Sequence, residues 1–226
     1  VRLLRGGVKA YYLPFPVYVT KSVTLIDTLP QEQPEERYIQ EFEYTGGYFD
    51  AAEREFRGFA NVKVTDPITN NFSQTIFHLG KDEDGALKGQ IKSIISYDGN
   101  GRPISETHNT YSVKKEGSGQ GDKFLGFPAL TEQTTTIYEE NNKSLTTKDT
   151  STYDSIGNVI SSTNLGELNK EGDEKTVSTA YAPAYAYSST DKTGFNRPLS
   201  AQLKDKDLNT VTRKDFAYDS KGNLTK

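Results

Sequence analysis

The sequence predicts an all-β fold built as an extended array of antiparallel hairpins. Three observations predict it: a hairpin turn signature that recurs, segments that alternate like half-buried strands, and almost no helical periodicity. The turn signature consists of an aromatic residue, Asp, two variable residues and Gly. Asp can bond the backbone two residues on, and Gly accepts a positive φ without steric cost. The three copies contain Tyr97, Asp98 and Gly101; Tyr153, Asp154 and Gly157; and Tyr218, Asp219 and Gly222.

The composition favours a thin sheet with partly wet faces over a globule with a deep core. Only 33% of the 226 residues are hydrophobic, whereas 14 Tyr and 11 Phe supply the aromatic side chains that suit a pleated surface. Helical character is limited to one expected turn at residues 51–55. A repeated hairpin without a reactive group in its turn is typical of a structural element more than of an enzyme.

The first half of the chain predicts several strands. Residues 8–26 contain Pro14 and Pro16, so we expect an edge strand or an extended crossing there, followed by a polar loop at residues 31–36. Two further strand segments are predicted at residues 38–44 and 48–49, on either side of Gly46 and Gly47. Residues 56–65 alternate strictly, with Phe56, Gly58, Ala60, Val62 and Val64 on one face and Arg57, Phe59, Asn61 and Lys63 on the other, and end at Asp66-Pro67. Two further strands, residues 71–79 and 90–97, are joined by the turn-rich residues 80–89.

The glycine-rich residues 114–123 are the expected connection between two regions, residues 1–113 and residues 124–226. After the connection the chain repeats itself loosely: residues starting at Gly126 lead to the turn at Tyr153, and residues starting at Gly194 lead to the turn at Tyr218. Such self-similarity predicts a repeat array. Because the chain begins with Val1, contains no Met and ends within a hairpin, we interpret it as a fragment whose array continues past Lys226.

Composition also excludes several classes of site and partner. The absence of Cys excludes disulfides, thiolate nucleophiles and cysteine metal sites. A net charge of −4 gives no general attraction to nucleic acid. No apolar run approaches the roughly 18 residues of a membrane span, and no signal peptide is visible.

Two acidic segments share part of the pattern of a calcium site. Residues Asp82, Glu83 and Asp84 lack a following Glu at the required spacing. Asp205, Asp207 and Asn209 have the opening of a calcium loop, but Thr210 and Phe216 occupy the places of its Gly and its bidentate Glu. We interpret both as hairpin turns, with a weak ion site left open as the alternative, and we predict no metal or cofactor.

No pattern predicts catalysis. His78 and His108 are the only histidines and have no second His at metal-ligand spacing, and no catalytic triad has a supporting motif. Residues 117–121 are glycine-rich but lack the Lys and helix of a phosphate-binding loop. The aromatic stripe at residues 181–187 could stack sugars or bases, but sheet packing explains it better because no basic residues interleave with it.

Two sets of residues resemble a known family. The Tyr-Asp turns resemble RHS/YD repeats, and residues 13–19, 42–50, 77–80 and 87–91 resemble the region of Tc toxin B components that joins their virulence-plasmid B-like, propeller part to their RHS array. The most specific block is Glu53, Arg54, Glu55, Phe56, Arg57, Gly58 and Phe59. In that family the RHS strands spiral into a hollow β-shell around a toxic C-terminal segment, and the self-cleaving aspartates lie in a motif that this sequence does not contain.

The resemblance implies a wall segment of such a shell, in a protein secreted by a bacterium or displayed on its surface. The expected partners are the rest of the parent chain (a propeller-like region upstream, further RHS repeats downstream and the enclosed toxin segment) and another toxin-complex subunit. The alternative is a surface-exposed β-repeat adhesin that binds glycans or proteins. Neither hypothesis includes enzymatic activity in these residues. Arg54 and Arg57 are expected to pair with nearby carboxylates, although exposed pairs contribute only about 0–1 kcal/mol.

Overall fold

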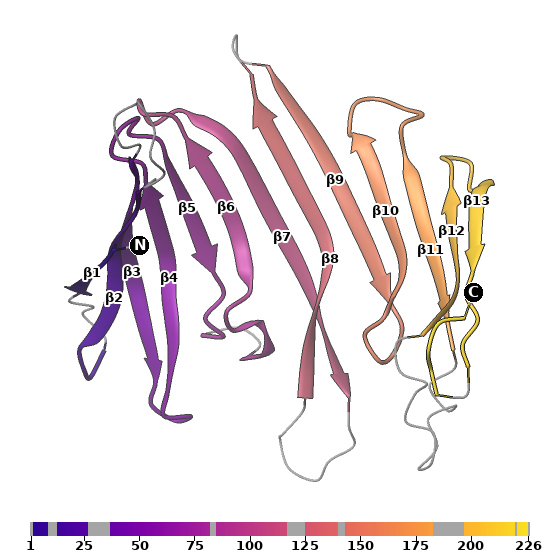
Figure 1. Ribbon diagram of the computed structural model, residues 1–226, viewed down its shortest axis with the longest axis horizontal. Helices are drawn as coiled ribbons and strands as arrows, with labels where there is room; N and C mark the ends of the chain where they lie inside the picture. The colour runs from indigo at the N-terminus through magenta and orange to yellow at the C-terminus, as the bar shows by residue number, and fades with distance from the viewer. Residues whose placement is uncertain are drawn as a thin grey trace. The chain divides into compact units, whose positions relative to one another are not determined.

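A computed structural model describes residues 2–8, 13–26, 37–81, 85–116, 125–139, 143–182, 197–219 and 221–225. Its strands follow one another through the sheet in chain order, so each strand lies next to its sequence neighbours (Figure 1). The all-β prediction is confirmed. The elements are β1 Arg2–Val8, β2 Val17–Ile26, β3 Arg37–Asp50, β4 Glu55–Thr65, β5 Phe72–Phe77, the short 3-10 helix η1 Gly85–Leu87, β6 Ile91–Tyr97, β7 Pro103–Glu116, β8 Leu125–Tyr138, β9 Ser144–Tyr153, β10 Val159–Glu167, β11 Lys175–Tyr181, β12 Pro198–Lys204 and β13 Thr210–Asp215.

The chain divides into two compact units. The first comprises residues 1–108 and 136–144, and the second comprises residues 109–135 and 145–226. The division falls within β7, whereas the predicted connection lies further along the chain: residues 114–116 belong to β7 and residues 117–123 lie outside the described part.

In the first unit, β3 and β4 form a long antiparallel ladder that contains a bulge. Residues 38–44 and 48–49, predicted as separate strands, belong to the single strand β3. The chain passes through Gly46 at φ +68°, and a Cβ on Gly46 would lie 2.8 Å from the Cβ of Ala60 on β4. Only glycine satisfies both conditions, so the glycines bend the strand without ending it.

The predicted strict alternation of β4 was wrong at Gly58. This residue has φ +94°, and the register against β3 shifts between Gly47 and Phe49. As a result, the rings of Phe56 and Phe59, predicted on opposite faces, meet edge-on with centroids 5.4 Å apart. The strand is half-buried throughout and is followed by Asp66-Pro67, as predicted.

The prolines near the N-terminus lie between strands and not inside one. Residues 13–16 precede β2, which is paired with β1 on one side and β3 on the other, so the prediction of an edge strand over residues 8–26 was wrong. Phe15 in this connection packs edge-on against Phe49 at 5.2 Å. Residues 51–54 form a turn and not a helical one, since Arg54 has φ +54°.

In the second unit, β9 to β13 form consecutive antiparallel pairs with a register shift in three of the four. Its few buried residues are mostly small and polar: Thr176 and Ser200 are buried, and the hydroxyls of Thr163 and Thr176 lie 2.9 Å apart across β10 and β11. This unit is stabilised by backbone pairing and hydroxyl contacts more than by aliphatic packing.

The described residues contain almost no apolar core. Ala129 is the only buried hydrophobic residue among them, while the buried polar residues are Ser22, Ser93, Asn158, Thr176 and Ser200. This agrees with the thin, partly wet sheet that the composition predicts. No helix in the described ranges is long and apolar enough to cross a membrane.

Candidate functional site

The three Tyr-Asp segments adopt the same hairpin turn. In each, the Asp N–H donates to the carbonyl four residues on (Asp98 to Arg102, Asp154 to Asn158, Asp219 to Asn223), at 2.9 to 3.0 Å. The glycine N–H donates back to the Asp carbonyl, and the glycines have φ between +80° and +92°. The Asp carboxylate accepts two further backbone N–H groups, so one side chain organises the whole turn.

A fourth copy of this turn occurs at Asp205, in the segment considered as a weak ion site. Asp205 N–H donates to Asn209 O at 3.0 Å, and the Asp205 carboxylate accepts from the N–H groups of Asp207 and Asn209. Leu208 takes the glycine position at φ +62°. The carboxylate is therefore occupied by its own turn. Across the described residues no group of three His, Asp or Glu side chains is placed to hold a metal ion, and Asp82, Glu83 and Asp84 lie outside them.

Hydrogen bonds within the turn lower the pKa of three carboxylates, those of Asp98, Asp205 and Asp219. The N–H of Arg102 lowers the pKa of Asp98, and the N–H of Asn209 lowers the pKa of Asp205. For Asp219, the side-chain amide of Asn223 and then its backbone N–H lower the pKa. These hydrogen bonds favour the ionised form.

The tyrosines of the last two turns contact the start of their own repeat. Tyr153 Oη donates to Leu130 O at 2.7 Å, and Tyr218 Oη donates to Pro198 O at 3.0 Å. Leu130 and Pro198 each lie four residues after the glycine, Gly126 or Gly194, that begins the repeated segment. The two segments thus share a contact at equivalent positions. Tyr97 differs, since its ring stacks on Phe72 at 4.6 Å.

In the block from Glu53 to Phe59, Arg57 links three parts of the first unit. Its Nη2 lies 2.8 Å from Asp50 Oδ2 at the end of β3, and its Nη1 donates to Gly80 O at 2.8 Å, beyond β5. The side chain is only 10% exposed. Gly80 has φ +64°, and a Cβ there would lie 2.7 Å from Arg57 Nη1. Arg57 therefore pairs with a carboxylate, as predicted, and also joins β4 to the β5–β6 connection.

The other charged members of the block lie at the rim of this cluster. Glu55 forms an ion pair with Lys88 (2.6 Å), while its Oε2 lies 3.9 Å from Arg57 Nε. Asp50 accepts from the N–H groups of Ala52 and Glu53, and the Glu53 N–H is the main cause of a lowered Asp50 pKa. Glu53 and Arg54 are exposed in the turn.

The two histidines occupy different environments. His78 continues the β5–β6 hairpin, donating its N–H to Gln90 O and accepting from Gly89 N–H. His108 Nε2 lies 3.5 Å from Glu106 Oε2, and the other Glu106 oxygen accepts from Tyr138 Oη at 2.7 Å. This hydrogen bond is the main cause of a raised Tyr138 pKa. Residues 117–121 and 183–187, which belong to the segments that the sequence offered for ligand binding, lie outside the described part of the chain.

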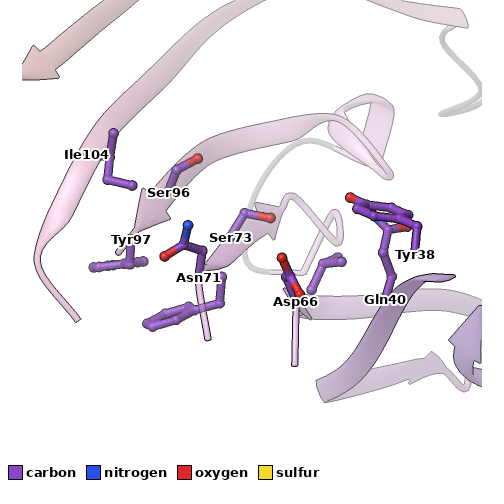
Figure 2. A pocket seen from close by; sticks show the side chains of 10 residues that line it. Tyr38, Gln40, Asp66, Asn71, Ser73, Ser96, Tyr97 and Ile104 are labelled. Carbon is purple, nitrogen blue, oxygen red and sulfur yellow. The ribbon is translucent and has the colours of Figure 1, made fainter. Parts of the chain in front are cut away.

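An open hollow of about 230 Å³ lies in the first unit, where the β4–β5 turn meets β3, β6 and β7. Figure 2 shows Tyr38 and Tyr97 on opposite sides, with Asp66, Asn71 and Ser73 between them. This hollow could not be predicted from the sequence because its residues come from five strands and the β4–β5 turn.

Comparisons with known proteins point to one group. Residues 3–78 match the model of the family described as the middle/N-terminal region of the insecticide toxin TcdB. This range contains residues 13–19, 42–50 and 53–59, which carry the resemblance noted from the sequence. The chain resembles the Tc toxin B component. No curated protein matches it.

Solved toxin-complex structures share its fold. TcdB2-TccC3 without its hypervariable C-terminal region has a TM-score of 0.70 at 13% identity, covering 95% of this chain and 15% of that chain. TcdB2-TccC3 itself gives 0.70 at 14%, covering 92% and 15%. The Tc holotoxin pore of Photorhabdus luminescens gives 0.70 at 14%, covering 92% and 15%. The chain therefore spans about a seventh of the length of these relatives.

Proposed function

We propose that this chain is a wall segment of a hollow RHS-type β-shell that encloses a C-terminal toxic polypeptide in a secreted bacterial toxin complex. The observation that carries the proposal is a sheet whose strands pair strictly in chain order and whose described residues bury one hydrophobic side chain, Ala129. A sheet of this kind has no interior of its own. Such a sheet suits a boundary between two compartments.

The Asp turns fit the rim of a wall. Each turn is closed by its own carboxylate and needs no neighbour, so hairpins of similar length can be added one after another. In this proposal Tyr97, Asp98 and Gly101, with their counterparts in the other copies, set where each hairpin ends. The residues are structural, and no catalytic step is assigned to them.

In this proposal the ion pair and the hydrogen bond of Arg57 hold neighbouring strands of the wall together. A wall without a packed core needs side-chain links between its strands in addition to backbone pairing. Arg57 on β4 supplies two such links, to Asp50 at the end of β3 and to the carbonyl of Gly80 beyond β5. The upstream and downstream parts of a longer parent chain, the enclosed polypeptide and another toxin-complex subunit are the proposed partners.

Protease protection of the enclosed polypeptide in the intact protein tests this function. We expect the enclosed segment to resist digestion in the native protein and to be cleaved after denaturation. Arg57→Ala should speed its cleavage because the variant loosens the wall. Arg102→Ala, which removes an arginine that is 78% exposed, is the matched control and should leave protection unchanged. Equal cleavage of the segment in native and denatured protein would overturn the proposal and favour the adhesin alternative.

A further inference from the structure

The hollow in Figure 2 has two aromatic sides. On one side lies Tyr38, whose side chain is not packed into the sheet: the residue is 53% exposed. On the other side Tyr97 stacks on Phe72 with an interplanar angle of 17°. Lys63 Nζ lies 4.6 Å from the centroid of the Phe72 ring, which holds that ring in place. The hollow therefore has one accessible aromatic ring, that of Tyr38, and one stacked pair of rings, those of Tyr97 and Phe72.

Between the aromatic sides lie polar side chains that have no hydrogen-bond partner among the described residues. The hydroxyls of Ser73 and Ser96 and the side-chain amide of Asn71 line the hollow, and none of them forms a hydrogen bond within the described residues. Gln40 Nε2 donates to Tyr38 Oη at 3.2 Å, which leaves the amide oxygen of Gln40 as an acceptor. These groups can donate to and accept from a ligand.

Asp66 is the one charged side chain that lines the hollow, and its turn holds it in position. Its Oδ1 accepts from Ile68 N–H at 2.8 Å, and its Oδ2 accepts from Thr69 Oγ1 at 2.8 Å. The Ile68 hydrogen bond is the main cause of a lowered Asp66 pKa, so the carboxylate is ionised at neutral pH. No Lys or Arg lines the hollow, so its charge is negative.

We propose that this hollow binds a single neutral saccharide ring. A sugar presents C–H groups on its faces, which stack on the negative face of an aromatic ring, and hydroxyls on its edges, which pair with amides, hydroxyls and a carboxylate. A purely apolar ligand would leave Asn71, Ser73 and Ser96 buried without partners, which is costly. Anionic groups would meet the Asp66 carboxylate, and no Lys or Arg is among the lining residues to pair with them. The volume is below the range of about 300–1,000 Å³ for drug-sized ligands, which fits one ring and not an oligosaccharide.

Saturation-transfer NMR on the intact protein tests the site, with methyl β-glucoside, methyl β-galactoside and methyl β-N-acetylglucosaminide as neutral probes. We expect saturation of the ring C–H protons of at least one probe, with a dissociation constant on the order of 1 mM. Methyl β-glucuronide, which differs from methyl β-glucoside only in a carboxylate in place of the C6 hydroxymethyl group, is the matched anionic comparison and should bind less tightly. If none of the neutral probes receives saturation, the proposal is wrong.

Matched variants locate the binding. Tyr38→Ala removes the accessible ring and should weaken binding by about tenfold or more, because a tenfold change corresponds to about 1.4 kcal/mol. Tyr18→Ala removes a tyrosine that is 77% exposed on β2 and does not line the hollow, and should change nothing. Asn71→Ala should also weaken binding while leaving the fold intact, because only its backbone takes part in the turn. Equal loss in Tyr38→Ala and Tyr18→Ala, or unchanged binding in Tyr38→Ala, would overturn the assignment.

Discussion

The first unit is held together by contacts that are particular to individual residues, whereas the second repeats one set of contacts. In the first, Arg57 joins Asp50 to Gly80, and aromatic rings meet between β3 and β4 and between β5 and β6. In the second, Asp turns recur, and the Tyr153 and Tyr218 hydroxyls reach a carbonyl at the start of their repeat. One kind of sheet is therefore stabilised in two ways, and only the second way leaves a repeating sequence signature.

The largest expected effect is in the first unit. Arg57→Ala leaves Asp50 without its cation in a site where the two side chains are 10% and 17% exposed, so we expect a loss of about 3 kcal/mol in the free energy of unfolding. Urea denaturation measures it. Arg102→Ala, at an exposed pair, should cost no more than about 0.5 kcal/mol. Similar losses in the two variants would show that Arg57 does not hold these strands together.

A smaller difference in stability is expected between two glycines that occupy the same position in two different turns. A Cβ on Gly157 would lie 3.3 Å from the Phe127 ring at φ +92°, whereas a Cβ on Gly101 meets nothing within 4 Å at φ +80°. Gly101→Ala should cost about 1 kcal/mol from backbone strain alone, and Gly157→Ala about 2 kcal/mol. Thermal unfolding compares them. Equal costs would mean that the turn tolerates the Phe127 contact.

The tyrosine contacts should contribute less. Tyr153→Phe and Tyr218→Phe each remove one hydroxyl that donates to a carbonyl, so each should cost about 1 kcal/mol. Tyr18→Phe, at an exposed position of the first unit, is the control and should have no measurable effect. If the control variant lost as much stability as the other two, the hydroxyl contacts would contribute nothing.

A glycine in place of Leu208 should make the fourth turn, at Asp205, more stable. Leu208 has φ +62° and is 63% exposed, so Leu208→Gly relieves strain at little cost in contacts and should stabilise the protein by about 0.5–1 kcal/mol. Differential scanning calorimetry would detect the increase in Tm. A decrease would show that Leu208 makes a contact worth more than the strain.

Acid should weaken the turns of both units. The pKa values of Asp98, Asp205 and Asp219 are lower in the folded protein than their ordinary value of 3.8. Their contribution to stability is therefore complete above about pH 4 and is lost as the pH falls through the folded pKa. Replacing one of them, as in Asp219→Asn, removes one of the carboxylates that must be protonated during acid unfolding. Tm should therefore decline less steeply in the variant than in the wild type between about pH 5 and pH 2. An unchanged decline would contradict the pKa assignment.

The sequence alone was sufficient to predict features that depend on residues close together in the chain, namely turns and one strand end. Asp and Gly spacing located three turns, and Asp66-Pro67 located the end of β4. The segment at Asp205 was correctly predicted as a hairpin turn, but not as a fourth copy of the signature, because Leu208 replaces the glycine. The Asp-to-Asn spacing of Asp205 and Asn209 nevertheless repeats that of Asp154 and Asn158.

Contacts between distant residues were not predictable in the same way. The alternation of β4 failed at Gly58 because a positive φ rotates the following side chains, and no hydropathy pattern records φ. The carbonyl partners of Arg57 and the sides of the hollow depend on which strands become neighbours, so they required the fold.

Cryo-electron microscopy of the intact protein, at a resolution that separates strands, tests the central claim most directly. We expect a closed hollow shell with residues 1–226 in its wall and density for a polypeptide inside. A solid or open rod, with no enclosed density, would contradict it.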